Sequence, residues 1–423
     1  MRNFTFKGLF LTAVFMLLGC LSIQAANDDL ITKQITIKLD EAGTLPGRIA
    51  SSKKYKITNL KLVGEINGTD WKMIREMAGS NYEGNTTEGK LSVLDLSEAK
   101  IVEGGDYYYI SYGIHGKKYH TSNEEIGNYA FHNCSGLTSL TLPSSLTTIG
   151  DWAFHNCSGL TSLTLPSSLT TIGDYAFLYC SGLTSLNLPA GITSIRDHAF
   201  SGCSGLTSLT LPAGITSIGE YAFCSCSGLT SLNLPAGITS IGESAFDGCS
   251  GLTSLNLPAG ITEIGELTFW GCSGLASLTL PAGITSIGEK AFWGCSGLTS
   301  LTLPAGITEI GSKAFQNCSG LTSIYVYAEK VPGIGRYAFD GCDAKKCTVY
   351  VPKGTYDDYW LSEFGYFENI VEFDATDIDK TTTSTDVKEV SRYSVNGQRL
   401  VGPTKGLNIV KYSDGSVKKV AVE

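Results

Sequence analysis

The sequence predicts a β-rich solenoid, in which short coils of chain stack along one axis. Cysteines return at a constant step of 23 residues, from Cys134 to Cys318. The phenylalanine three places before each cysteine keeps that step, from Phe131 to Phe315. Each repeat also holds a short apolar alternation that ends at a proline. A fixed period of this length is the sequence signature of a stacked-repeat fold.

One repeat reads Ile-Gly-x-x-Ala-Phe-x-x-Cys-Ser-Gly-Leu-Thr-Ser-Leu-x-Leu-Pro-x-x-Ile-Thr-x. Alternation around Leu163 and Leu165 predicts a strand that Pro166 ends, and Ile-Thr-Ser-Ile predicts a second, shorter strand. Gly219 turns the chain, and residues 220–223 are long enough for one helical or 3-10 turn. A lone coil buries too few apolar side chains to fold, so each coil depends on its neighbours.

Different sequence patterns flank the repeats and predict end caps. Residues 27–125 predict an α/β N-terminal cap, with a helix that starts at Trp71 after Thr69 and Asp70 and ends at Gly79. The predicted division is a signal peptide at 1–26, this cap, the repeat array at 126–330, a C-terminal cap at 331–372, a linker at 373–387 and a small β module at 388–423. Hairpin signals at Asn396-Gly397 and Asp414-Gly415 support the last assignment.

The first residues are typical of a secretory signal. Arg2 and Lys7 precede an apolar run at 9–18 that is too short to span a bilayer, and small residues at 25 and 26 suit cleavage. The alternative is a lipoprotein-type cleavage that would place a lipid on Cys20. Both interpretations predict export from the cytoplasm.

The composition excludes some classes of partner. The net charge is −9 and charged residues make up 17% of the chain, whereas phosphate binding needs a basic surface. We therefore expect no nucleic-acid partner. No later segment is long and apolar enough for a transmembrane helix. We expect a monomer without cofactors.

The unit IGEYAFxGCSGLTSLxLPAGIT resembles the BspA-type leucine-rich repeat of bacterial surface proteins, common in Bacteroidetes. The resemblance covers about residues 126–350 and includes the lead-in ITNLKLVGEINGTDWKMIREMAG. It implies a leucine-rich repeat solenoid that is secreted to the surface or outer membrane of a Gram-negative bacterium. It also implies a non-enzymatic role in adhesion or binding to host matrix or bacterial surface proteins. The tail at 388–423 is similar to C-terminal sorting domains of type IX secretion.

The cysteines are best interpreted as small buried side chains, one in each coil. Cys342 and Cys347 stand apart from the regular step, and a disulfide between them is the alternative. Cys224 is predicted to be a free thiol. His132 and His155 fall in adjacent coils, but no further ligand follows at their step, so a metal site is not expected.

A column of acidic residues also repeats. We interpret it as carboxylates that meet free N–H groups at the turns, because no second carboxylate recurs to build a calcium site. No arrangement of Ser, His and acid predicts catalysis. The acidic column is Asp151, Asp174, Asp197, Glu220, Glu243, Glu266 and Glu289.

Two departures from the repeat are candidates for recognition. Trp270 and Trp293 fall on neighbouring coils just after the repeat phenylalanine, where exposed aromatic residues would mark a protein or sugar contact. An insertion at 104–125 carries the tyrosines Tyr107, Tyr108, Tyr109, Tyr112 and Tyr119. The alternatives are packing of the tryptophans against the next turn, and an insertion that merely lies over the first coil. A glycan-binding module or a purely structural surface protein are the competing functions.

Overall fold

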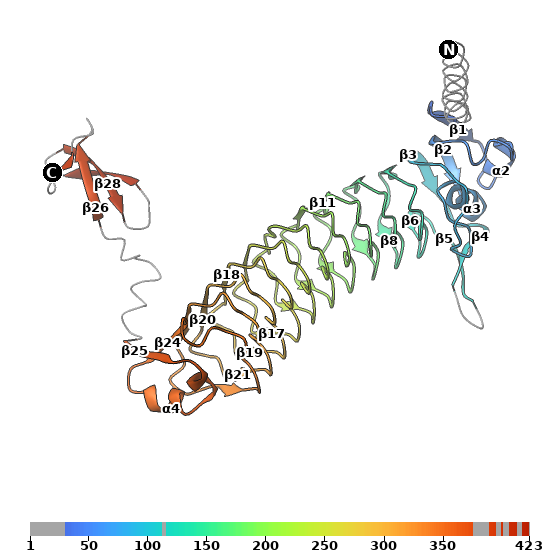
Figure 1. Cartoon of the computed structure of the whole chain (residues 1–423). Helices are drawn as coiled ribbons and strands as arrows, with labels where there is room; N and C mark the ends of the chain where they lie inside the picture. Colours follow the sequence, from blue (N-terminus) through green and yellow to red (C-terminus); the bar gives the residue numbers. More distant parts are fainter. Residues whose placement is uncertain are drawn as a thin grey trace, which may run out of the picture.

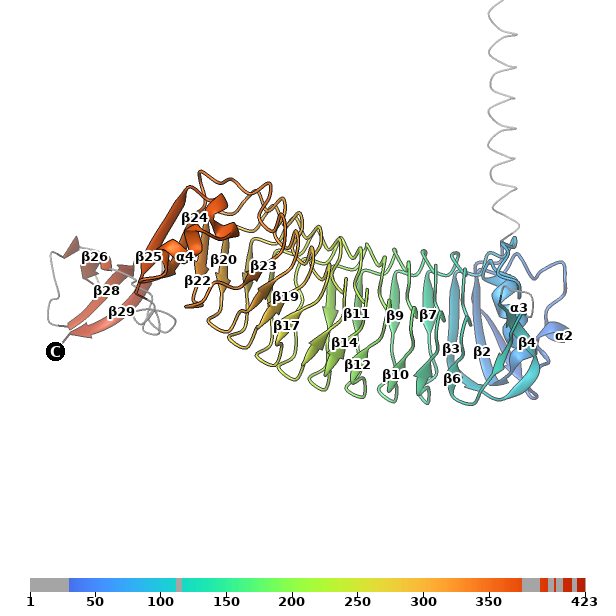
Figure 2. The same ribbon diagram turned by 90° about the horizontal axis from the view of Figure 1, so that it is seen from below.

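The protein is an elongated, curved solenoid (Figure 1, Figure 2). The computed structural model describes residues 30–111 and 116–374, and in the tail the backbone of 389–394, 399–400, 406–412 and 417–422. The predicted β-rich solenoid fold is confirmed. Parallel strand pairing already begins at strand β1 (Ile35–Leu39), inside the expected N-terminal cap, and continues to β25 (Asn369–Phe373).

The first row of strands comes from the Leu-Thr-Ser-Leu segment of each repeat. Most neighbours pair in parallel at the repeat spacing, as Leu140 does with Leu163. The leucines point into the core while the residues between them face outward. The row contains β1, β2 (Asn59–Ile66), β3 (Val93–Ile101), β7 (Ser139–Thr141), β9 (Ser162–Thr164), β11 (Ser185–Asn187), β13 (Ser208–Thr210), β16 (Ser254–Asn256), β18 (Ser277–Thr279), β20 (Ser300–Leu303), β22 (Ser323–Val326), β24 (Thr348–Pro352) and β25. The pairing has breaks after β9, β13 and β18.

The second row comes from the Ile-Thr-x-Ile segment, and its strands are only two residues long. They also pair in parallel, as Ile218 does with Ile241. The row contains β6 (Glu125–Ile126), β8 (Thr148–Ile149), β10 (Thr171–Ile172), β12 (Ser194–Ile195), β14 (Ser217–Ile218), β15 (Ser240–Ile241), β17 (Glu263–Ile264), β19 (Ser286–Ile287), β21 (Glu309–Ile310) and β23 (Gly333–Ile334).

The third side of each coil is a run of single turns. In the first coil the N–H of Ala130 donates to the carbonyl of Gly127, a 3-10-type bond of 3.2 Å. The next N–H, that of Phe131, instead donates to Ala153 of the following coil at 2.7 Å. Tyr129 and its counterparts in later coils have positive φ, near 61° here, which turns alternate N–H groups along the rod axis. This segment therefore ties each coil to the next one.

A column of phenylalanines fills the core. We use "column" for equivalent residues of successive coils. From Phe131 to Phe339 the rings stack with centroids 5.1 to 5.7 Å apart, and all are buried. The cysteine column lies beside it, fully buried, and the interpretation of these residues as space-filling side chains is confirmed. From Cys157 onward, each thiol of the column also donates to the phenylalanine carbonyl of the preceding coil, as Cys226 does to Phe200 at 3.1 Å.

A glycine column allows the coils to approach closely. A Cβ added at Gly205 would lie 2.3 Å from the carbonyl oxygen of Ser181 in the preceding coil. No side chain fits at that distance, so the backbone spacing of the stack explains the invariable glycine after Cys-Ser in the repeat.

The N-terminal cap covers the open end of the first coil. It contains α2 (Leu45–Arg48), α3 (Gly68–Met77) and a hairpin of β4 (Gly104–Ile110) and β5 (Lys118–Thr121). The predicted helix is present, but it begins earlier than expected. Its N-cap is Asn67, which forms a reciprocal capping box with Asp70.

Side chains of this cap replace the N–H groups of a preceding coil. The carbonyls of Asn128, Ala130 and His132 are those that a preceding coil would bond. Tyr108 donates its hydroxyl to Asn128 at 2.8 Å, and Trp71 donates its indole N–H to Ala130 at 3.0 Å. The Arg75 guanidinium reaches Ala130 at 2.9 Å and His132 at 3.2 Å.

The C-terminal cap contains α4 (Tyr356–Trp360) and the 3-10 helix η1 (Glu363–Tyr366), which lie between β24 and β25. Phe364 and Phe367 contact the last ring of the phenylalanine column, Phe339, at centroid distances of 5.0 and 5.3 Å. Tyr359 donates its hydroxyl to the carbonyl of Ala328 at 2.7 Å.

The tail forms one antiparallel sheet with the strand order β27-β26-β28-β29. Its strands are β26 (Glu389–Ser394), β27 (Arg399–Leu400), β28 (Gly406–Tyr412) and β29 (Val417–Val422). The antiparallel pairs flank both predicted hairpin turns, although the turn residues themselves lie outside the described residues. Within the described part of the chain, no helix is long and apolar enough to cross a membrane.

Candidate interaction surface

The run of single turns presents two aromatic groups at the surface of the rod. We call this surface the turn edge, defined by the residues two places before and one place after each repeat phenylalanine. The first group, the N-terminal ladder, is a column of half-buried rings from five successive coils. Neighbouring centroids are 4.1 to 6.0 Å apart and the rings are nearly parallel. Its members are Tyr129, Trp152, Tyr175, His198 and Tyr221.

The second group is the tryptophan pair, Trp270 and Trp293. The two indoles stack at 5.0 Å with an interplanar angle of 5°, and both side chains are half-buried. Trp293 donates its ring N–H to the Oε1 of Gln316 at 3.0 Å. The structure therefore brings together the two residues that the sequence singled out, and gives each a stacked neighbour as well as partial exposure.

The tyrosine insertion is mostly a structural element. Tyr108 and Tyr109 are only 1% and 2% exposed, so they cannot serve as surface anchors, contrary to the sequence-based expectation. Their rings pack between the cap helix and the first coil. Burial raises the pKa of Tyr108, whose hydroxyl donates to Asn128.

Two other tyrosines of the insertion are half-buried, and the fifth is not described. Tyr107 lies 4.5 Å from the ammonium of Lys118, and Tyr119 lies 5.2 Å from that of Lys117. Because the lysines already lie over these rings, only part of each ring of Tyr107 and Tyr119 can contact a binding partner. Tyr112 lies outside the described residues.

The two repeat histidines form a stacked pair. The rings of His132 and His155 are 4.7 Å apart and inclined by 22°, and neither Nδ1 has a hydrogen-bond partner among the residues that the structure describes. Nearly parallel imidazoles direct their in-plane lone pairs alongside each other, so the pair cannot converge on one metal ion. Burial lowers the pKa of His132 to about 3 and that of His155 to about 4, which keeps both rings neutral.

Two members of the acidic column, Asp151 and Asp197, bond backbone N–H groups, but the donors belong to the next coil. Asp151 accepts from the N–H of Asp174, and Asp197 accepts from that of Glu220, both at 2.9 Å. Asp174 instead pairs with the guanidinium of Arg196 at 2.8 Å. Within the described residues, no group of three or more His, Cys, Asp or Glu is arranged to hold a metal ion.

The cysteines outside the regular step are also free thiols. Cys342 belongs to the cysteine column after all, because its thiol reaches the carbonyl of Phe315 at 3.4 Å across a repeat that is one residue longer. Cys347 is buried and unpaired, so the structure does not contain the disulfide that the sequence left open. Cys224 is the partly exposed thiol.

The N-terminal ladder was not among the sites predicted from the sequence, although the sequence contains a signal for it. The residue two places before the repeat phenylalanine is aromatic in five successive coils and then changes to Ser244, Leu267 and Lys290. The coil therefore folds without an aromatic ring at this position. The position of Trp270 and Trp293 does not need an aromatic ring either, because Asp247 occupies it in an earlier coil.

These features define a class: a leucine-rich repeat solenoid with capped ends and without a described catalytic or metal-binding arrangement. The chain belongs to the family described as the BspA type leucine-rich repeat region, whose model matches residues 105–230 and 216–346. Members are typically cell-surface repeat proteins that bind other proteins, and the relatives are not enzymes. No curated protein matches the chain.

Several solved structures are similar. A leucine-rich repeat protein from Bacteroides ovatus is 26% identical, over 60% of this chain and 82% of that one, with a TM-score of 0.32. A leucine-rich repeat protein of T. pallidum is 32% identical, over 41% and 71%, with a TM-score of 0.31. A leucine-rich cell surface protein from Faecalibacterium prausnitzii is 27% identical, over 62% and 85%, with a TM-score of 0.36.

Proposed function

We propose that this protein is exported, displayed at the cell surface, and binds extracellular proteins through the turn edge, in adhesion to host matrix or to other bacteria. The observation that carries the proposal is the internal comparison between coils. The Trp152 position is occupied by Lys in a later coil, and the Trp270 position by Asp in an earlier one. The phenylalanine column already fills the core, so the aromatic rings of the turn edge are not required for folding.

The geometry favours a protein partner over a glycan. A sugar stacks on the face of an aromatic ring, whereas the faces of Trp152 and Tyr175 cover each other at 4.1 Å and those of the tryptophan pair at 5.0 Å. Ring edges remain for a partner. Large, rigid aromatic side chains are the typical anchors of protein interfaces, because they bury area at small entropic cost.

The test uses substitutions that the chain already tolerates at equivalent positions. One variant combines Trp270→Asp with Trp293→Gln, and a second combines Trp152→Lys with Tyr175→Lys. Each is compared with the unmodified protein on immobilised matrix proteins and glycans. We expect the binding to matrix protein to fall by at least about tenfold for each altered anchor that lies in the interface.

A matched control is Lys313→Ser, which changes a turn-edge residue in a coil without aromatic rings at the turn edge. Unfolding transitions of all variants must stay near that of the unmodified protein. If both double variants fold and bind as well as the unmodified protein, the turn edge is not part of the binding site. If the unmodified protein binds an immobilised glycan but no matrix protein, the result would support the glycan-binding alternative. If it binds neither, the result would favour a structural role.

A further inference from the structure

Exposed apolar side chains gather at the C-terminal end of the rod. Within the described residues, seven large apolar side chains are exposed, and six of them lie between residues 337 and 371. They include Leu361, which is 84% exposed, and Trp360, which is 47% exposed. The six are Tyr337, Tyr356, Trp360, Leu361, Tyr366 and Val371. The rod therefore has one end with an unusual density of uncovered apolar surface.

The last coil also has open backbone groups. At most earlier junctions of the second row, carbonyls accept from the next coil, as those of Thr308 and Ile310 accept from Gly333 and Gly335 at 2.8 and 2.7 Å. The junctions between β10 and β12 and between β15 and β17 are the exceptions. The equivalent carbonyls of the last coil belong to Pro332 and Ile334. Neither accepts a hydrogen bond from any residue that the structure describes.

The turn segment of the last coil has backbone N–H groups without hydrogen-bond acceptors in the described part of the chain. The N–H groups of Lys313 and Phe315 donate to the following coil, at 3.0 and 2.8 Å. Their counterparts, the N–H groups of Tyr337 and Phe339, have no hydrogen-bond acceptor in the described part of the chain. This end differs from the N-terminal end, where side chains of the cap bond the carbonyls of the first coil.

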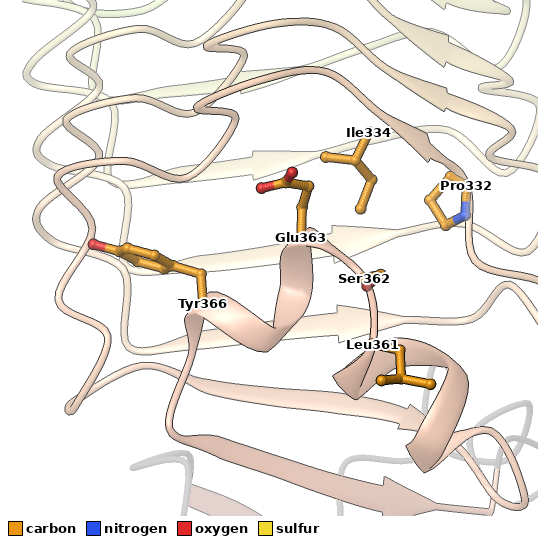
Figure 3. A pocket seen from close by; sticks show the side chains of 6 residues that line it. All are labelled: Pro332, Ile334, Leu361, Ser362, Glu363 and Tyr366. Carbon is orange, nitrogen blue, oxygen red and sulfur yellow. The ribbon is translucent and has the colours of Figure 1, made fainter.

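A groove runs beside these open groups. Its largest part is a pocket of about 510 Å³ between β23 and the segment from α4 to η1, lined by Pro332, Ile334, Leu361, Ser362, Glu363 and Tyr366 (Figure 3). Glu363 and Tyr366 also line a smaller pocket of about 100 Å³ against Tyr337 and Phe339. The groove thus has an apolar wall, a backbone edge with both acceptors and donors, and room for one extended chain.

The negative charge of the groove favours a peptide segment with basic side chains. Its lining residues, together with those of the adjoining pocket along β21 and β23, include the carboxylates of Glu309, Asp340 and Glu363 and no lysine or arginine. None of these three carboxylates forms a salt bridge with a described residue. A basic segment would therefore gain electrostatically at this end of the rod.

We propose that the C-terminal end of the solenoid is a docking site for an extended, lysine- or arginine-bearing segment of a partner protein. The segment lies along β23 in the place of a further coil. It donates N–H groups to the carbonyls of Pro332 and Ile334 and accepts from those of Tyr337 and Phe339. Its apolar side chains cover Leu361, and its basic side chains face Glu363. This is strand addition to an exposed sheet edge, and it does not involve the N-terminal ladder or the tryptophan pair.

The test measures fluorescence anisotropy of a labelled peptide, Ac-Thr-Val-Lys-Val-Thr-Val-Lys-Val-amide, titrated with the chain from residue 27 to its end. Two control peptides replace both lysines by glutamate, or carry N-methyl groups at alternate residues, which removes the backbone donors. We expect binding by the lysine peptide, at least about tenfold weaker binding by the glutamate peptide, and none by the N-methylated peptide.

Substitutions in the groove test whether the peptide binds there. Leu361→Asp and Glu363→Lys change exposed residues, so both should fold, and each should weaken binding by about tenfold. Glu220→Lys, an exposed acidic residue in a central coil, is the matched control and should leave binding unchanged. Absence of binding by the lysine peptide, or binding that neither Leu361→Asp nor Glu363→Lys weakens, would overturn the proposal. The aromatic variants of the turn edge should bind the peptide normally.

Discussion

Replacing Arg75 by methionine should loosen the first coil without unfolding the rest of the rod. Arg75 is fully buried in α3 and donates to five acceptors: the carbonyls of Tyr129, Ala130, His132 and Asn81, and the hydroxyl of Ser80. No described carboxylate pairs with it. Backbone carbonyls, the hydroxyl of Ser80 and the ring of Tyr109, 5.0 Å from the guanidinium carbon, therefore hold this buried charge.

The magnitude follows from the bonds that survive the substitution. Ala130 keeps the indole N–H of Trp71, and the carbonyl of Tyr129 keeps the N–H of His132. The carbonyl of His132 keeps only a distant thiol, that of Cys134 at 4.0 Å. One unsatisfied buried carbonyl costs about 1–3 kcal/mol, and the other weakened bonds add to it. Methionine avoids the desolvation of a guanidinium, which offsets part of the loss. We expect a net loss of about 2–3 kcal/mol.

Native-state hydrogen exchange measures this local effect. A loss of about 2–3 kcal/mol should speed amide exchange in residues 126–134 by roughly 30- to 160-fold, while residues 284–295 exchange as before. Arg48→Met is the control, because Arg48 is half exposed, pairs with Asp40 at the surface, and should contribute less than about 1 kcal/mol. Exchange in residues 126–134 that stays within twofold of the unmodified protein would refute the assigned role of Arg75.

Three further outcomes can be measured. Phe223→Ala should lower the free energy of unfolding by about 3–5 kcal/mol in denaturant titrations, and Phe223→Leu by less than half of that, because the buried ring stacks on both neighbours. The unfolded histidines bind protons below about pH 6.5, whereas His132 and His155 in the folded chain stay neutral down to pH values of about 3 and 4, so stability should fall as the pH drops below 6.5. His132→Leu should flatten that pH dependence, and an unchanged slope would contradict it. Native alkylation of the chain from residue 27 should modify Cys224 alone, with the other thiols reacting only after unfolding.

The repeat alone was enough to predict the solenoid, both rows of strands and the core columns. These features depend on short-range alternation and on a constant step, which are visible within one or two repeats. The cap was harder to predict. The helix was expected, but the bonds of Trp71 and Arg75 to the first coil join residues more than fifty positions apart, and no local pattern encodes them.

The candidate sites show the same limit. Clustering of Trp270 with Trp293 could be predicted, because the residues are one repeat apart. The burial of Tyr108 and Tyr109 could not, because it depends on how the hairpin packs against α3 and the first coil. The alternating turn geometry was also missed, since positive φ at Tyr129 and its counterparts occurs in residues other than glycine.

Because the turn segments of neighbouring coils join in the same way throughout the rod, the number of coils can change without any change at either end. In the turn segment, every coil presents to the next the same set of N–H groups and carbonyls, and the N-terminal cap bonds only the first coil. Gain or loss of one whole 23-residue unit would recreate an existing junction, as between Phe200 and Phe223, and would leave both ends intact. Each such event would change the separation of the two ends by about 4.8 Å, the spacing of adjacent strands. Unequal recombination between near-identical repeats can thus adjust the reach of the protein in fixed increments, without redesign of either end.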